Sequence, residues 1–255
     1  MQRLIKRAIL LLFVTTLLLI PVIGSADGEV IRISGSNRYE TSLKLNQYFG
    51  WANSAIVING ESFPDSISAT SLSAQIGAPI YISANVEVLR GEFNRLGVSN
   101  VIIVGGENSV SKDIEDNLRD TYNVKRLAGR NRYATSDFVA NYAGLNTVAV
   151  VSGQDYKDAL ISTNFLKPKN VAIKLSDGVS SIPDFNIKYV VGENAVESHE
   201  NTYRINTGNT EFNALKIFET MPRKSNLIIA GDGNFADALS AGGALEVMGS
   251  TAYAC

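Results

Sequence analysis

Two arginines occupy the same place in a repeated heptapeptide and are the side chains of this sequence best suited to bind an anion. The segment GSNRYET covers 35–41 and GRNRYAT covers 129–135, so Arg38 and Arg132 are equivalent. A guanidinium binds a carboxylate or a phosphate through two parallel hydrogen bonds. Both arginines are expected in the first turn of a helix, where the helix dipole disfavours a cation. Each therefore needs a partner for its charge.

Two kinds of partner fit this spacing. Asp65, Asp158 and Asp237 recur once in each copy of a second motif, in the next strand-to-helix loop, and a pair between arginine and aspartate would join two loops or two repeats. Alternatively, the arginines bind an anionic ligand, because ligands of open α/β sheets bind at the carboxyl ends of the strands. The residues alone leave both hypotheses open.

The other residues of the heptapeptide have conformational roles. Asn37 and Asn131 precede the expected helices and can cap them by accepting a bond from a free backbone N–H group. The preceding glycines suit the turn. Glu40 would complete a capping box in the first copy, but Ala134 stands there in the second. Capping explains asparagine and glycine but not arginine. The candidate residues for an anionic polymer are Asn37, Arg38, Tyr39, Asn131, Arg132 and Tyr133.

Most catalytic chemistry is excluded by what the chain lacks. Its one histidine, His199, lies in the polar segment ESHENTY, which is typical of a surface loop, and its one cysteine is the last residue, Cys255. The sequence contains no Gly-x4-Gly-Lys-Ser/Thr phosphate loop, no Gly-x-Gly-x-x-Gly and no Gly-x-Ser-x-Gly elbow. We therefore predict no enzyme activity, no metal site and no cofactor.

The heptapeptide is part of a longer repeat. RISGSNRYETS (32–42) and RLAGRNRYATS (126–136) are identical at seven of eleven positions, and IVINGESFPDSIS (56–68) matches AVVSGQDYKDALIS (149–162). VIIVGGENSV (101–110) then matches YVVGENAV (189–196). A third copy begins with YRINTGNTEFNALKIF (203–218) and LIIAGDGNFADALSAG (227–242). It has Thr210-Glu211 in place of Arg-Tyr.

Each copy predicts alternating strands and helices. In the first, the strands are EVIRIS (29–34), AIVIN (55–59), PIYIS (79–83) and NVIIVGG (100–106), with helices between them. Short runs of valine and isoleucine without alternation are typical of strands buried on both faces of a parallel sheet. The predicted fold class is α/β, with tandem three-layer units of Rossmann or flavodoxin type. The second copy is shorter near KPKNVAIKLSDG (167–178), where we expect a helix to be reduced to a loop.

The first 26 residues predict a secretory signal peptide. They contain Arg3, Lys6 and Arg7, an apolar run from 8 to 20, and small residues before a cleavage point after Ala26. The run is shorter than the roughly 20 residues that span a bilayer. The chain after cleavage has 20 basic and 25 acidic side chains and a net charge of −5. We therefore expect a secreted protein that binds neither nucleic acid nor, after cleavage, a membrane.

The three motifs, in this order, resemble the cell-wall-binding repeat 2 family of Gram-positive, chiefly clostridial, surface proteins. The resemblance extends from about Val30 to Gly242. It implies a pseudo-threefold arrangement of three Rossmann-like repeats that attach a protein non-covalently to an anionic cell-wall polysaccharide. The expected organisation is a signal peptide (1–26), repeat 1 (27–124), repeat 2 (125–202) and repeat 3 (203–255), whose motifs are incomplete.

The resemblance implies a cell-wall anchor, and two other functions stay open. One is a surface-layer scaffold that binds other surface proteins. The other is a remnant of a longer wall-active protein, because modules of this family are often joined to wall-active enzymes.

Overall fold

The computed structural model describes residues 29–61, 63–82, 85–182, 184–193, 201–221, 226–230, 235–244, 248 and 250–254. The chain forms two units, residues 1–32 and 33–255, and the second contains all the helices and strands described below. The predicted signal peptide, His199 and Cys255 lie outside the described residues, as does the side chain of Asp237.

The first sheet has four parallel strands in the order β2-β1-β3-β4, the flavodoxin-like order. Its strands β1 and β3 are the apolar runs recognised in the sequence, and their side chains are buried on both faces. The elements are α2 (Arg38–Asn46), β1 (Ser54–Ile58), α3 (Phe63–Ile76), β2 (Ile80–Ile82), α4 (Val86–Leu96), β3 (Asn100–Val104), α5 (Lys112–Arg119) and β4 (Asn123–Leu127).

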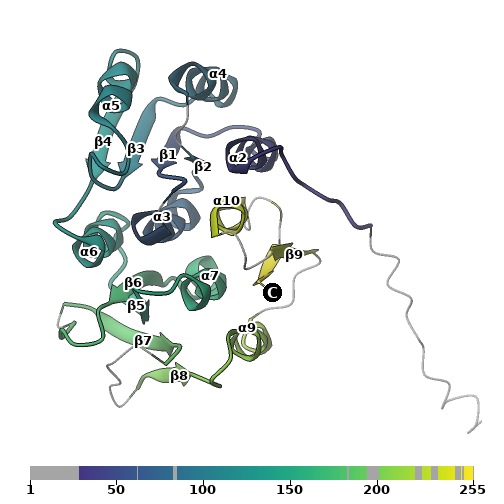
Figure 1. The fold of residues 1–255 in the computed structure, drawn as a ribbon, viewed down its shortest axis with the longest axis vertical. Coiled ribbons are helices and arrows are strands. Elements are labelled where there is room, and N and C mark those ends of the chain that lie inside the picture. Colours follow the sequence, from purple (N-terminus) through teal and green to yellow (C-terminus); the bar gives the residue numbers. More distant parts are fainter. Residues whose placement is uncertain are drawn as a thin grey trace, which may run out of the picture. The chain divides into compact units, whose positions relative to one another are not determined.

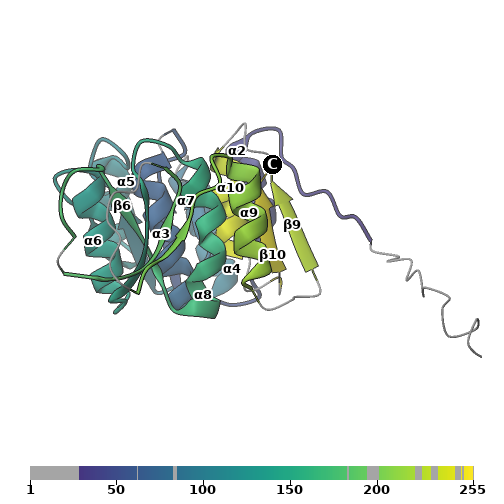
Figure 2. The same cartoon turned by 90° about the horizontal axis from the view of Figure 1, so that it is seen from below.

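The second sheet repeats this order as β6-β5-β7-β8, and the third has two described parallel strands, β9 and β10. Figures 1 and 2 show these sheets and the helices that cover them. The elements are α6 (Arg132–Tyr142), β5 (Thr147–Ser152), α7 (Lys157–Ser162), the 3-10 helix η1 (Thr163–Phe165), α8 (Leu166–Lys169), β6 (Ala172–Ser176), β7 (Asn186–Val191), β8 (Tyr203–Ile205), α9 (Thr210–Glu219), β9 (Asn226–Ala230), α10 (Phe235–Ala244) and β10 (Ser250–Ala254). The predicted α/β fold with parallel sheets is confirmed.

The sheets are offset from the sequence repeats. The strand that precedes the second heptapeptide, β4, pairs with β3 of the first sheet, and β8 likewise pairs with β7 of the second. The expected boundary between 124 and 125 therefore falls inside β4. The helix that follows each of these strands crosses to the next sheet, since α6 packs on β6 and α9 packs on β10.

This offset explains one wrong prediction. Residues 29–34 were expected to form a strand, but the structure has no strand there. The equivalent strands β4 and β8 exist because each pairs with the third strand of the preceding sheet. No described strand precedes the first repeat to offer 29–34 such a partner, and an isolated extended segment has no ladder of hydrogen bonds to hold it.

The helix expected to be lost from the second repeat is indeed replaced by a loop. In the first sheet α4 connects β2 to β3, whereas residues 177–185 connect β6 to β7 without a helix among the described residues. The segment 167–178 itself contains the end of α8 and all of β6. The shortening thus removes a covering helix and keeps the strand.

The three repeats share one core. Figure 1 shows α3, α7 and α10 on the inner side of the sheets, and α10 packs on both α3 and α7. Thr70, Thr163 and Gly242 each lie five residues after the repeated aspartate. A Cβ atom added to Gly242 would lie 3.5 Å from Cγ2 of Thr70 and 3.7 Å from Cγ2 of Thr163. Equivalent residues of three repeats therefore meet in this core.

Helix side chains cover the outer edge strands of both four-stranded sheets. The backbone N–H groups of Ile173 and Leu175 in β6 donate to Ser71 Oγ at 2.8 Å and Ser136 Oγ at 3.2 Å. In β2, the carbonyl oxygen of Ile80 accepts from Asn46 Nδ2 at 2.8 Å. An edge strand exposes unpaired backbone groups, and these side chains satisfy some of them.

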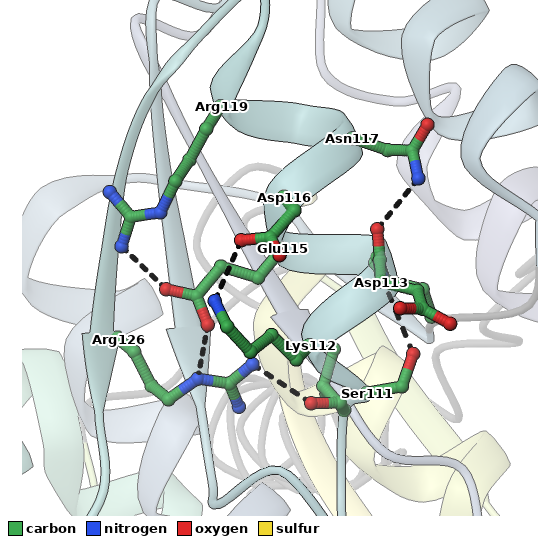
Figure 3. Close-up of polar contacts among 10 residues, drawn as sticks. Ser111, Lys112, Asp113, Glu115, Asp116, Asn117, Arg119 and Arg126 are labelled. Atoms are coloured by element: carbon green, nitrogen blue, oxygen red, sulfur yellow. Dashed lines mark hydrogen bonds and ion pairs between the residues drawn. The ribbon is translucent and has the colours of Figure 1, made fainter.

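A buried ion pair attaches β4 to α5, and backbone bonds of the same arginine attach β4 to the loop that follows β3 (Figure 3). Arg126 donates from Nε to Glu115 Oε2 at 2.7 Å, and its other nitrogens donate to the carbonyl oxygens of Gly105 at 2.7 Å and Val110 at 2.8 Å. Arg119 bonds the second carboxylate oxygen. Glu115 is only 6% exposed. Burial raises its pKa, but the bonds from both arginines outweigh this effect and leave the pKa below its usual value.

Arg126→Met should lower the free energy of unfolding by about 3–5 kcal/mol, because it leaves a buried carboxylate with one of its two arginines removed. Lys112→Met is the matched control, since Lys112 forms an exposed pair with Asp116. It should change stability by less than about 1 kcal/mol. Urea unfolding followed by circular dichroism measures both, and equal effects of the two substitutions would contradict this role of Arg126.

Candidate functional site

The glycine and the threonine of the heptapeptide form a clasp at the start of each helix. Gly35 N–H donates to Thr41 Oγ1 at 3.0 Å, and Gly129 N–H donates to Thr135 Oγ1 at 3.1 Å. A Cβ atom added to Gly35 would lie 2.5 Å from the backbone nitrogen of Thr41. Only glycine allows this approach, so the two ends of the motif have structural roles.

The asparagines cap their helices, as predicted. Asn37 Oδ1 accepts from the Glu40 N–H at 3.0 Å, and Asn131 Oδ1 accepts from the Ala134 N–H at 2.9 Å. The third repeat keeps this cap through Asn209. The capping box suggested by Glu40 is not formed by these contacts, because the Glu40 carboxylate bonds the backbone and hydroxyl of Ser36.

The two arginines contact backbone carbonyl groups of the next strand-to-helix loop. Arg38 Nη1 donates to the carbonyl oxygen of Gly60, just after β1, and Arg132 Nη1 donates to the equivalent carbonyl of Gly153 at 2.6 Å. The Arg38 guanidinium also lies 3.8 Å from the Glu61 carboxylate. In these contacts the arginines bond the backbone, and neither contact is a pair with Asp65 or Asp158.

The tyrosines contact the residue that follows each of these glycines. Tyr39 OH donates to Glu61 Oε1 at 3.1 Å, and Gln154 Nε2 donates to Tyr133 OH at 2.7 Å. Burial raises the pKa of Tyr39, and the bond to Glu61 raises it further. We call each set of contacts a loop clamp: Arg38 and Tyr39 on 60–61 in repeat 1, and Arg132 and Tyr133 on 153–154 in repeat 2.

The clamped glycines were not among the predicted site residues. A Cβ atom added to Gly153 would lie 2.5 Å from Cε1 of Tyr133, and one added to Gly60 would lie 3.2 Å from Cδ of Arg38. The alignment of NGE (59–61) with SGQ (152–154) shows that this glycine is repeated. A glycine repeated after a strand marks close approach by another group, which is the clamp at Gly153 and both Ile82 and the clamp at Gly60.

Asp65 and Asp158 lie beside the loop that follows the third strand of the first and second sheets. Asp65 Oδ2 accepts from Ser109 Oγ at 3.0 Å, and a Cβ atom added to Gly105 would lie 3.0 Å from the same oxygen. Asp158 has the same relation to Gly192, where an added Cβ atom would lie 2.0 Å from Oδ2. Both glycines have positive φ, 112° and 84°. These aspartates therefore pack closely against the glycine of that loop within their own sheets.

Asp158 also joins the second repeat to the third. Asn213, which stands where the heptapeptide has threonine, donates from Nδ2 to Asp158 Oδ1 at 3.1 Å and accepts from the Thr207 N–H at 2.8 Å. Thr210, in the position of the arginine, also lowers the pKa of this carboxyl group. The third repeat thus replaces the loop clamp by neutral contacts to an acidic group.

Gly153→Ala should lower the free energy of unfolding by about 1–3 kcal/mol, because the added methyl group overlaps the Tyr133 ring. Gly106→Ala is the control, since an added Cβ atom there meets nothing within 4 Å. Its effect should be below about 1 kcal/mol. Chemical denaturation measures both. A Gly153 variant as stable as the Gly106 variant would contradict the packing of the clamp.

Asp158→Asn should stabilise the protein at neutral pH. Burial, and secondarily the charge of Asp155, raises the pKa of Asp158 in spite of the bonds from Asn213 and Thr210. The folded state then holds the proton more tightly than the unfolded chain. The cost of ionising this carboxyl is absent below the ordinary value of about 3.9 and grows as the pH rises through the raised value.

The gain in melting temperature from Asp158→Asn should therefore be larger at neutral pH than below about pH 4. The exposed Asp120, replaced by asparagine, serves as the control. A gain that is the same at both pH values would show that the substitution acts through packing alone.

The described residues contain no group of three or more His, Cys, Asp or Glu side chains arranged to hold a metal ion. Among those same residues, no helix has the length and apolar character needed to cross a bilayer.

Comparison with solved structures shows the fold. Cwp6 from Clostridium difficile superposes with a TM-score of 0.76 and 22% identity, covering 91% of this chain and 43% of that one. Cwp8 from the same organism also gives 0.76, with 21% identity over 89% of this chain and 45% of its own.

Curated proteins share parts of the sequence. N-acetylmuramoyl-L-alanine amidase LytC of Bacillus subtilis is 37% identical over 157 residues, which are 59% of this chain. The amidase enhancer of the same organism is 26% identical over 237 residues, or 86% of this chain. This chain spans only 30% and 33% of the length of these two relatives.

The family described as Cell wall binding domain 2 (CWB2) matches residues 32–115 and 126–201. These two regions contain both loop clamps, with the two copies of the full heptapeptide. The chain therefore belongs to the cell wall binding domain 2 family, and cell-wall binding is the function of the domain that it repeats.

Proposed function

We propose that this chain is a secreted, non-covalent anchor that binds an anionic polysaccharide of a Gram-positive cell wall and has no catalytic activity of its own. The proposed units are a signal peptide at 1–26 and repeats at 27–124, 125–202 and 203–255. The observation that carries the proposal is the repetition of the loop clamp. Two sheets present the same fixed loop, with the same partly buried arginine, at their carboxyl edges.

Repeated sites of this kind suit a polymer. The clamps fix two loops before any ligand arrives, so binding does not have to order them. A polymer that contacts one loop has a high effective concentration at the next, and weak contacts then add to a strong attachment. A local cation on each edge is also compatible with an acidic chain, because attraction at short range depends on nearby charges.

A surface-layer scaffold that binds other proteins is the second candidate function. Phe212, Leu215 and Phe218 on α9, and Leu227 and Ile229 on β9, are between 41% and 65% exposed. Figure 2 shows α9 beside the strands of the third sheet. Exposed apolar groups gathered on neighbouring elements are typical of a protein-binding surface. This candidate predicts binding to surface proteins and not to extracted walls.

The purified chain from Asp27 onward should sediment with Gram-positive cell walls, and acid extraction of the non-peptidoglycan polymers should abolish this binding. Binding should also weaken steeply with salt, since the Debye length falls from about 30 Å at 0.01 M to about 3 Å at 1 M. Circular dichroism confirms folding. A folded chain that binds extracted and intact walls equally would contradict a polysaccharide ligand.

Paired variants separate the charge of the clamp from its structural role. Arg38→Ala with Arg132→Ala removes both cations and both loop contacts, whereas Tyr39→Phe with Tyr133→Phe removes hydrogen bonds and keeps the cations. The arginine double variant should bind walls more weakly and with a smaller salt dependence than the tyrosine variant. If both melt lower and bind walls equally well, the arginines act only as clamps and the ligand role proposed for the heptapeptide is wrong.

A further inference from the structure

At one pair of equivalent positions, the first sheet has an aromatic residue and the second has a charged one. Ile80 pairs with Ile56 and Ile173 pairs with Ala149, so the next residues, Tyr81 and Lys174, are equivalent. Tyr81 is buried beneath α4, with its ring 5.3 Å from that of Phe93 and its hydroxyl 3.2 Å from Glu92. An aromatic residue in the first sheet thus corresponds to a lysine in the second.

The lysine is almost as well buried as the tyrosine. The Lys174 side chain is 7% exposed, and its Nζ lies 2.7 Å from Asp137 Oδ1 and 3.3 Å from the carbonyl oxygen of Tyr133. Asp137 occupies the place that Leu43 has in the first repeat. In the second repeat an ion pair therefore occupies the places of Tyr81 and Leu43, and the described residues of 177–185 form no helix. Burying a pair of charges carries a desolvation cost, which suggests that this pair has a function.

These charged residues line a cavity. Its volume is about 260 Å³, and its walls include Arg130, Asp137, Lys174, Ser176, Ser180 and Ser181. We call it the repeat 2 cavity. It lies at the carboxyl end of β6, beside the start of α6, in the space beside the loop that replaces a covering helix. Hydroxyl groups and both signs of charge meet there, whereas a structural void in a protein core is apolar.

The loop on one side of the cavity is held in shape without a ligand. The Asp177 carboxylate accepts from the Val179 N–H at 2.9 Å, the Ser180 N–H at 2.7 Å and Ser180 Oγ at 2.6 Å. The bonds from Ser180, and then from Val179, lower the pKa of Asp177 to about 2. Gly178 has φ of 81°, and its N–H donates to Ser176 Oγ at 3.0 Å. The cavity wall is therefore pre-organised.

Arg130 gives the cavity an available cation. It follows Gly129 in the heptapeptide, where the first repeat has Ser36. The structure shows no acceptor within bonding distance of Arg130 in the part of the chain that it describes. Lys174 Nζ forms an ion pair with Asp137 and donates to the carbonyl oxygen of Tyr133. Asp137 and the serines supply acceptors.

We propose that the repeat 2 cavity binds one sugar unit that carries an acidic group, with Arg130 binding the acid and the serines and the Lys174–Asp137 pair binding ring hydroxyls. This inference rests on the proposed function, since such a unit would belong to the anionic wall polysaccharide. A volume slightly below the usual range for ligand pockets, about 300–1,000 Å³, suits a single ring. In the first repeat the equivalent places are occupied by α4, Tyr81 and Leu43.

Saturation-transfer NMR on the folded chain, with glucuronate, glucose 1-phosphate and glucose as separate probes, tests the cavity. The two acidic sugars distinguish a carboxylate from a phosphate, and at least one should bind more tightly than glucose. Arg130→Ser, which introduces the residue of the first repeat, should weaken the acidic sugar about tenfold, the effect of a hydrogen bond to a charged group, and leave glucose unchanged. Ser181→Tyr, which fills the cavity from an exposed loop position, should weaken all three.

Lys112→Ser is the control, because it removes one exposed positive charge outside the cavity. An equal loss in this variant would show attraction to net charge and would overturn the inference. Wild-type protein that sediments with cell walls but binds none of the sugars would also overturn it, and would leave the anchor proposal intact. Sugar binding that Arg130→Ser weakens, in a chain that does not sediment with walls, would support the cavity and contradict the anchor.

Discussion

The architecture depends on one constraint: the helix that follows the last strand of each sheet must pack against the next sheet. The chain leaves β4 in the first sheet and enters α6 on the second, and the turn between them is the heptapeptide. Each residue that both copies of the motif share makes a contact that stabilises this connection. Glycine and threonine close the turn, asparagine begins the helix, and arginine and tyrosine hold the first loop of the sheet on which the helix lies.

This arrangement explains why α9 still packs on the third sheet although the third repeat has no arginine in the heptapeptide. Its helix α9 keeps the asparagine cap, and Asn213 takes over the clasp while reaching the carboxylate of Asp158. The second and third repeats are thus joined by an amide on an acid, whereas a guanidinium on a carbonyl holds a loop within each of the first two repeats. The packing of α3, α7 and α10 does not depend on which of these polar contacts is present, because the shared core is built from apolar side chains.

The sequence predicts most of the fold and little of the site, for physical reasons. AIVI and VIIV form central strands because side chains buried on both faces must all be apolar, and the asparagines form caps because capping needs only neighbouring residues. Arg38 bonds a backbone carbonyl, and such a contact leaves no side-chain signature in a sequence. Residues 29–34 have strand propensity, but a strand also needs a neighbour. The repeat 2 cavity depends on a helix that is absent, and neither Lys174 nor Asp137 is unusual in its local sequence.

The offset between sequence repeats and sheets has a consequence for how such chains can be divided. The second and third sequence repeats each carry, at their start, the final strand of the preceding sheet. Deleting or transplanting one repeat by its sequence boundaries would take a strand from its neighbour and leave that neighbour's third strand with an open edge. The natural unit for recombination therefore begins between that strand and the crossing helix, near 128–131, where a cut keeps each sheet whole and leaves α6 with the sheet on which it packs.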